Sequence, residues 1–235
     1  RKKKALIIAH HVDRKIAPNV TDYKMAYFSN LFYFNNNGYS GFSNICDKDL
    51  LETDLGEDTY NEFFDTRIKP CITTTKYLSD NLGKKLDTEI PDGFLFVPLQ
   101  VENDTVMSLK TIKTDELVKL VIKVSQKSGI PVVLKIHPKT PKKHYSRTNK
   151  THLADGKNVF LSNGDIRELL NKSKAVFTIN SGTGFEALLR MKHVFTYGKS
   201  DYQQATHQNI TDVDTIIEDI NKPVDNKKIK QLLYH

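Results

Sequence analysis

Short apolar runs alternate with amphipathic segments through the second half of the chain, and this alternation predicts an α/β fold. Residues 94–97, 132–136 and 175–179 are rich in β-branched and aromatic side chains, which is typical of buried strands. Residues 115–128 predict a helix, because they carry apolar side chains at helical spacing: Leu117, Leu120, Val121 and Val124. Gly129 comes directly after this segment and suits the end of a helix.

The same alternation continues toward the C-terminus. Residues 159–161 and 194–197 predict two more strands, and residues 166–172 and 185–191 predict two more helices. Strands that alternate with helices of this length form βαβ units, whose parallel strands all end at the same edge of the sheet. Because open α/β sheets bind ligands at that edge, we expect a ligand site where these strands end.

The first half of the chain has weaker patterns. Residues 5–9 form a short apolar run that predicts a strand. Residues 24–35 predict a helix that buries aromatic side chains and stops before Gly38. Helical spacing also occurs at 59–64 and again at 229–234, near the end of the chain.

The 235-residue chain is long enough for one large domain or two small ones. We expect an N-terminal half at 1–108, a Rossmann-like half at 109–205, and a C-terminal tail at 206–235 that packs back onto them. No run of about 18 apolar residues occurs, so we expect no transmembrane helix. Since the sequence begins at Arg1 rather than at Met, we also expect it to be part of a longer, multidomain protein.

Basic side chains outnumber acidic ones by 35 to 28, which gives a formal net charge of +7. Such a surface attracts anions. One basic cluster lies at 139–150, and its only aromatic ring for stacking on bases is Tyr145, so we expect no nucleic-acid partner. The cluster is either a solvated loop or a loop that favours an anionic substrate. Cys46 and Cys71 form neither a disulfide framework nor a zinc site, which favours a reducing compartment.

Small and hydroxyl-bearing residues follow the strand at 175–179, in the sequence Asn180-Ser181-Gly182-Thr183-Gly184. Such a loop before a helix lets backbone N–H groups approach an anion, and its two hydroxyls add hydrogen-bond donors. The loop matches neither the dinucleotide-binding motif nor the P-loop, so we predict a phosphate site of another type. The alternative is that the glycines only permit a tight turn.

Two further polar groups follow strands at the same edge. Lys135 and His137 are two residues apart on one strand and so point to the same side, where His137 can hydrogen-bond a phosphate or a ribose hydroxyl. Gln100 and Asp104 follow the strand at 94–97, and a carboxylate there can act as a nucleophile or a base. The alternatives are a structural histidine and a polar loop in which Asp104 caps a helix.

Together these three groups resemble the capsule polysaccharide biosynthesis family, which includes the bacterial β-Kdo glycosyltransferases that build capsule lipid linkers. The resemblance covers roughly residues 94–205, in both the order and the spacing of its motifs. The matching segments are Pro98-Leu99-Gln100-Val101-x-x-Asp104, Lys135-x-His137-Pro138, Thr178-x-Asn180-Ser181-x-Thr183-Gly184-x-Glu186-Ala187-Leu188 and Gly198-x-x-x-Tyr202.

The resemblance implies a GT-B-like fold, in which two Rossmann-like halves with parallel sheets enclose an active cleft. Residues 109–205 would then bind the nucleotide-sugar donor, and residues 1–108 would form the acceptor side. It also implies that Asp104 is the catalytic carboxylate, as a nucleophile in a retaining double displacement. Its motif partner Gln100 would assist catalysis by orienting either Asp104 or the sugar. The donor would be bound by Lys135, His137, Asn180, Ser181, Gly182, Thr183, Gly184, Glu186 and Tyr202.

We therefore expect a glycosyltransferase that moves a sugar from a nucleotide-sugar donor to a glycan or glycolipid acceptor, in the cytoplasm and in peripheral contact with the membrane. No metal or other cofactor is expected, because the D-x-D patterns at 47–49 and 212–214 follow no convincing strand. One alternative is a sugar-nucleotide epimerase of GT-B-like fold, which needs no acceptor. The other is a non-catalytic module that binds a glycan or a nucleotide.

Overall fold

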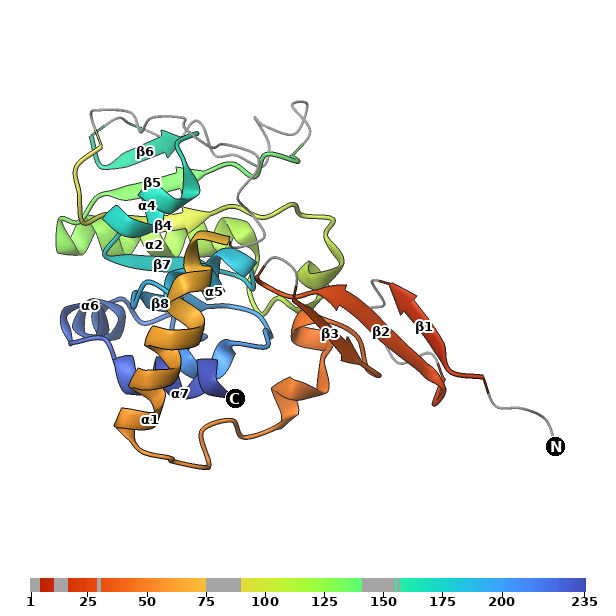
Figure 1. Ribbon diagram of the computed structural model, residues 1–235. Helices are drawn as coiled ribbons and strands as arrows, with labels where there is room; N and C mark the ends of the chain where they lie inside the picture. Colours follow the sequence, from red (N-terminus) through yellow and green to blue (C-terminus); the bar gives the residue numbers. More distant parts are fainter. Residues whose placement is uncertain (1–4, 11–16, 29–30, 75–89, 141–154, 156) are drawn as a thin grey trace.

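A six-stranded parallel sheet forms the centre of the computed structural model, which describes residues 5–10, 17–28, 31–74, 90–140, 155 and 157–235 (Figure 1). The strands run in the order β6-β5-β4-β7-β8-β9, and each neighbouring pair is parallel. This order reverses between β4 and β7, as in a Rossmann-like sheet. The strands are β4 (Leu95–Pro98), β5 (Val132–Lys135), β6 (Val159–Ser162), β7 (Ala175–Thr178), β8 (His193–Thr196) and β9 (His207–Gln208).

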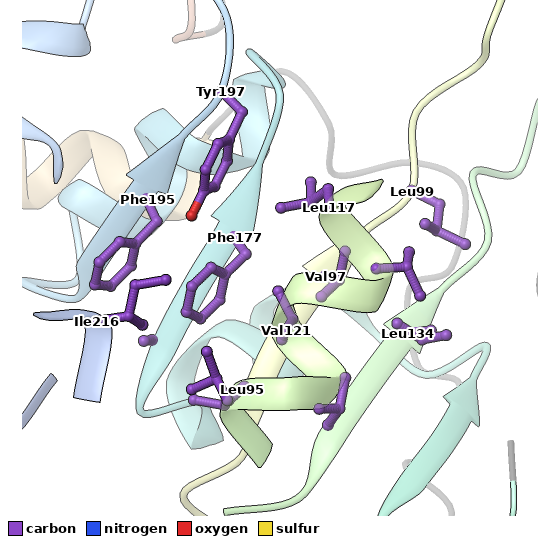
Figure 2. Packing of buried hydrophobic residues seen from close by; sticks show 14 of the residues in the cluster. Leu95, Val97, Leu99, Leu117, Val121, Leu134, Phe177, Phe195, Tyr197 and Ile216 are labelled. Carbon is purple, nitrogen blue, oxygen red and sulfur yellow. The ribbon is translucent and has the colours of Figure 1, made fainter. Parts of the chain in front are cut away.

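Helices cover both faces of this sheet, because alternate side chains of each strand point to opposite faces. Leu95 and Val97 pack in one apolar cluster with α2 (Thr114–Ser128) and α6 (Val213–Asn221), as Figure 2 shows for part of the cluster. Phe96 packs in a second cluster on the other face. The helices of that face are α4 (Ile166–Lys172), α5 (Gly182–Leu188) and α7 (Asn226–Tyr234). The parallel α/β sheet predicted from the sequence is therefore confirmed.

Two helix ends show how the sequence sets the element boundaries. Gly129 ends α2 in the left-handed conformation, with φ of 73°, as predicted for a residue without a side chain. The helix predicted at 185–191 begins earlier, at Gly182, because the Ser181 hydroxyl accepts the backbone N–H of Thr183 and caps it. Part of the small-residue loop is thus the first turn of α5.

The N-terminal part contains a small mixed sheet with the strand order β1-β2-β3. Its strands are β1 (Ile7–His10), β2 (Val20–Met25) and β3 (Phe32–Asn35). The helix predicted at 24–35 was wrong, because this stretch contains the end of β2, a turn and an antiparallel β3. Aromatic side chains favour the strand pairing, since the ring of Tyr23 stacks on that of Phe32 with centroids 5.1 Å apart.

Residues 36–74, the described stretch that follows β3, are mostly helical. This stretch contains short 3₁₀ turns at Ser40–Phe42 and Asn44–Asp47, then α1 (Glu57–Phe63), a π-helical turn at Phe64–Ile68 and a 3₁₀ segment at Lys69–Thr74. Further 3₁₀ turns occur at Thr105–Leu109 and Gln203–Ala205. Helix α1 packs on α7, where the ring centroids of Phe63 and Tyr234 lie 4.9 Å apart. The helical spacing predicted at 59–64 and 229–234 is therefore confirmed.

The two halves expected from the sequence differ in the size and type of their sheets. Strand β4 precedes residue 108 yet lies at the centre of the parallel sheet, so the Rossmann-like unit begins before the expected boundary. Within the described part of residues 1–94, the sheet is three-stranded and mixed rather than a second parallel sheet. Among all the residues that the structure describes, none of the helices has the length and apolar character that a membrane span requires.

Candidate active site

A cavity of about 750 Å³ lies where the sheet order reverses, at the carboxyl ends of β4 and β7. Segments that follow β4, β5, β6 and β7 line one side of it. Residues of β2 and β3 line the other side, and in Figure 1 the small sheet lies on the side to which the arrows of β4 and β5 point. Ligands of open α/β sheets bind at such reversal points, so this cavity is the candidate site.

Gln100 and Asn180 join the two loops that flank the reversal point. The Gln100 amide donates to Asn180 Oδ1 at 3.1 Å, and its Oε1 accepts the Asn180 backbone N–H at 3.1 Å. Thr178 donates its hydroxyl to the same oxygen at 3.2 Å, and the Asn180 amide donates to the Val106 carbonyl at 2.7 Å. Because these contacts occupy both side chains, they hold the loops in place, and Gln100 orients the site through Asn180.

The loop after β7 presents hydroxyls and backbone to the cavity. Ser181, Gly182 and Thr183 line it, at the start of α5. Gly184 and Tyr202 are not lining residues but support the loop from behind. The Tyr202 hydroxyl donates to the Ser181 carbonyl, and a Cβ on Gly184 would lie only 2.5 Å from that hydroxyl. A glycine is therefore required for this close approach.

Lys135 and His137 lie at the end of β5, and both line the cavity as predicted. Lys135 is buried and donates to the Gly164 carbonyl at 2.8 Å, so it also fixes the loop after β6. The His137 Nδ1 accepts the backbone N–H of Lys139 at 3.1 Å, which places the proton of the neutral ring on Nε2. A donor of this kind suits a phosphate or sugar oxygen.

Asp104 lines the same cavity and also caps a short helical turn. Its Oδ1 accepts the backbone N–H of Val106 at 3.3 Å, and its side chain is exposed. The two interpretations of Asp104, as a carboxylate at the site and as a helix cap, therefore do not exclude each other, since the same side chain lines the cavity and accepts the capping bond. The capping contact engages one oxygen and orients the carboxylate.

Glu186 is the most unusual group of the site. It lines the cavity but is only 1% exposed, and among the described residues neither of its carboxyl oxygens has a hydrogen-bond partner. Burial raises its pKa to about 7, although the positive charge of Arg190 opposes the shift. The nearby Asp165 is held instead by Arg167, with an N···O distance of 2.7 Å.

A second wall was missed by sequence analysis. Lys24, Tyr27, Tyr33 and Tyr39 line the cavity from the N-terminal part, and Asp201 joins them from the loop after β8. The segment Gly198-x-x-x-Tyr202 contains Asp201 without assigning it a role. The N-terminal members belong to the stretch in and around the wrongly predicted helix.

The D-x-D patterns lie outside the cavity. Asp47 pairs with Lys199 at 3.0 Å, and Asp212 accepts the backbone N–H of Thr215 at 2.8 Å, as the cap of α6. The parts of the chain that the structure describes hold no group of three or more side chains that would suit a metal ion. Lys139 lines the cavity, but residues 141–154 of the basic cluster lie outside the described residues.

Comparison with known proteins identifies the sequence relatives. A family model described as "Capsule polysaccharide biosynthesis protein" matches residues 73–234. The protein FixF of Sinorhizobium fredii (strain NBRC 101917 / NGR234) is 32% identical over 119 residues. That match covers 48% of this chain and only 28% of FixF, so the chain corresponds to a fraction of this relative.

Two solved structures share the fold. The Thermosulfurimonas dismutans KpsC beta Kdo 2,4 transferase superposes with a TM-score of 0.59 at 14% identity, over 91% of this chain and 71% of that one. The KpsC beta Kdo 2,7 transferase of the same organism gives 0.52 at 14% identity, over 92% and 70%. At this level of identity the likeness concerns the fold.

Proposed function

Because the chain belongs to the capsule polysaccharide biosynthesis protein family, we propose that it is a glycosyltransferase that moves a sugar from a nucleotide-sugar donor to a glycan or glycolipid acceptor. One observation carries the proposal. The cavity at the reversal point of the sheet brings Asp104, His137 and the Ser181–Thr183 loop together, although they are far apart in sequence. The two KpsC proteins that share the fold are beta Kdo transferases, which is an activity of the same class.

The donor phosphate would bind between β5 and α5. The His137 Nε2 proton and the hydroxyls of Ser181 and Thr183 are hydrogen-bond donors, and the first turn of α5 adds the positive end of its dipole. Lys139, at the same rim, adds a positive charge. These groups would stabilise the charge that develops on the departing nucleotide, without a metal ion.

Glu186 would bind the ribose or base rather than the phosphate. A buried carboxyl whose pKa burial raises to about 7 is largely protonated below that pH, so it donates a hydrogen bond and carries no charge to repel the donor. Its oxygens have no hydrogen-bond partner among the described residues, and a ligand hydroxyl would supply one.

Asp104 would be the nucleophile of a retaining double displacement. In the first step its carboxylate forms a bond to the anomeric carbon while the bond from that carbon to the nucleotide phosphate breaks. In the second step the acceptor hydroxyl attacks the anomeric carbon and loses its proton to a base, the bond to Asp104 breaks, and the carboxylate is regenerated. The capping bond to Val106 would hold the attacking group in one orientation.

The proposal is tested by a thermal-shift screen of nucleotides and nucleotide sugars, followed by mass spectrometry of reactions with bacterial oligosaccharides. A bound nucleotide at about 100 times its Kd should stabilise the chain by about 2.7 kcal/mol. Transfer of the donor sugar to an oligosaccharide supports the proposal. Conversion of the donor sugar without any acceptor would instead indicate epimerisation, and binding with no conversion would indicate a non-catalytic module.

A further inference from the structure

The second wall of the cavity has a composition of its own. Tyr27, Tyr33 and Tyr39 supply aromatic rings, Lys24 supplies a cation, and Asp201 supplies a carboxylate. Aromatic rings pack on the apolar faces of sugar rings, while carboxylates and ammonium groups hydrogen-bond sugar hydroxyls. This wall adjoins α5, and its chemistry suits a carbohydrate rather than a nucleotide phosphate.

Asp201 is held firmly in this wall. The Tyr27 hydroxyl donates to its Oδ1 at 2.6 Å, and the Tyr27 ring stacks on Phe185 of α5 with centroids 4.1 Å apart. The next residue, Tyr202, donates to the Ser181 carbonyl. Asp201 is therefore linked to α5 through Tyr27 and to the loop Asn180–Gly184 through its neighbour Tyr202, and its position is fixed relative to both.

The rest of the wall is also ordered by contacts within it. The Lys24 ammonium lies 3.1 Å from the centroid of the Tyr39 ring. The Tyr33 hydroxyl accepts the backbone N–H of Ser40 at 3.2 Å. These contacts join β2, β3 and the first 3₁₀ turn into one surface. Tyr39 is buried within it and supports Lys24, whereas Lys24, Tyr27 and Tyr33 are partly exposed.

The other carboxyl groups that line the cavity have other partners or lie on other sides of it. The side chain of Arg167 donates two hydrogen bonds to Asp165, at 2.7 and 3.1 Å, and its backbone N–H donates a third at 2.8 Å. Glu186 is buried beneath the donor loop, and Asp104 lies on the β4 side. Among the lining residues that the structure describes, Asp201 is the carboxylate on the second wall.

We propose that this wall is the subsite for a carbohydrate acceptor and that Asp201 is the base that receives the proton of the attacking hydroxyl. The inference rests on the proposed function. As the acceptor oxygen bonds to the anomeric carbon and the sugar leaves Asp104, the hydroxyl proton moves to a carboxylate oxygen of Asp201. That proton later passes to water, which restores the base.

The surroundings of Asp201 suit this role. Burial raises its pKa, which increases its basicity toward a hydroxyl, while the hydrogen bond from Tyr27 and the charge of Lys24 oppose the shift. The hydrogen bond from Tyr27 engages one carboxylate oxygen, and a carboxylate can accept at both.

The test compares Asp201→Asn and Tyr27→Phe with the matched control Asp47→Asn, whose exposed carboxylate lies outside the cavity. Three quantities are measured on each protein: stabilisation by UDP and by CMP, binding to an array of bacterial capsule and lipopolysaccharide oligosaccharides, and transfer to the oligosaccharides that bind. Release of nucleotide from the donor without an oligosaccharide is measured as well.

Asp201→Asn should reduce transfer by about 10²-fold or more, while nucleotide binding and nucleotide release to water stay within about two-fold of wild type. Tyr27→Phe should reduce transfer by about 10-fold, and the control should match wild type. Transfer by Asp201→Asn within about three-fold of wild type overturns the inference. So does a wild-type chain that binds nucleotide but no oligosaccharide. A chain that binds oligosaccharides but no nucleotide contradicts the proposed function and leaves the subsite supported.

Discussion

Replacing Glu186 by Gln should stabilise the fold at alkaline pH, because the change removes a carboxylate that burial disfavours. The folded pKa is about 7 against an ordinary 4.5. Between these values the unfolded chain has lost the proton while the folded chain keeps it, so folding stability falls as the pH rises. Above pH 7 the loss of folding free energy levels off at about 3 kcal/mol. This value follows because each tenfold difference in proton affinity between the folded and unfolded chain is equivalent to about 1.4 kcal/mol.

The amide introduced by this change must also find hydrogen-bond partners, so we expect a net gain for Glu186→Gln of about 2 kcal/mol at pH 8.5 and almost none at pH 4.5. Urea unfolding followed by circular dichroism at both pH values measures the difference. Glu168→Gln is the matched control, since Glu168 is exposed on the neighbouring helix α4. A Glu186→Gln variant that is no more stable than wild type at pH 8.5, or equally stabilised at both pH values, would refute the reasoning.

Three further predictions concern the candidate site. Asp104→Asn should lower turnover by about 10²–10⁴-fold with little change in melting temperature, because Asn caps a helix about as well as Asp but is no nucleophile; near-normal turnover would contradict this. Gln100→Ala should weaken nucleotide binding and lower the free energy of unfolding by about 1–3 kcal/mol, since it leaves the Asn180 N–H without its acceptor, and calorimetry and urea titration measure both. Turnover should persist in EDTA, and complete loss that Mn²⁺ or Mg²⁺ reverses would show a metal requirement.

The central sheet was predictable because its strands are buried on both faces. Such strands are continuous apolar runs, as at Phe94–Val97 and Val132–Leu134, and they can be read without knowledge of their neighbours. Helix α2 was predictable for a related reason, since its apolar spacing and Gly129 are local signals. The edge at which the polar loops meet then followed from the handedness of parallel crossovers.

The N-terminal sheet and the second wall were not predictable in this way. The aromatic residues of β2 and β3 also fit a helix. They form strands because residues 22–25 pair with residues 32–35, which the sequence pattern alone does not show. The hydrogen bond between Gln100 and Asn180 joins residues 80 positions apart, and no local pattern indicates it. For the same reason the sequence did not indicate that the Gln100 side chain binds Asn180 and Thr178, at the end of β7.

The most direct test of the proposed donor site is a structure of the chain with a bound nucleotide taken from the thermal-shift screen. We expect the nucleotide phosphate to lie within hydrogen-bond distance, about 3 Å, of the His137 Nε2 or of the hydroxyls of Ser181 and Thr183. A nucleotide bound more than about 10 Å, or three hydrogen-bond lengths, from both His137 and the Ser181–Thr183 loop would contradict the proposed donor site.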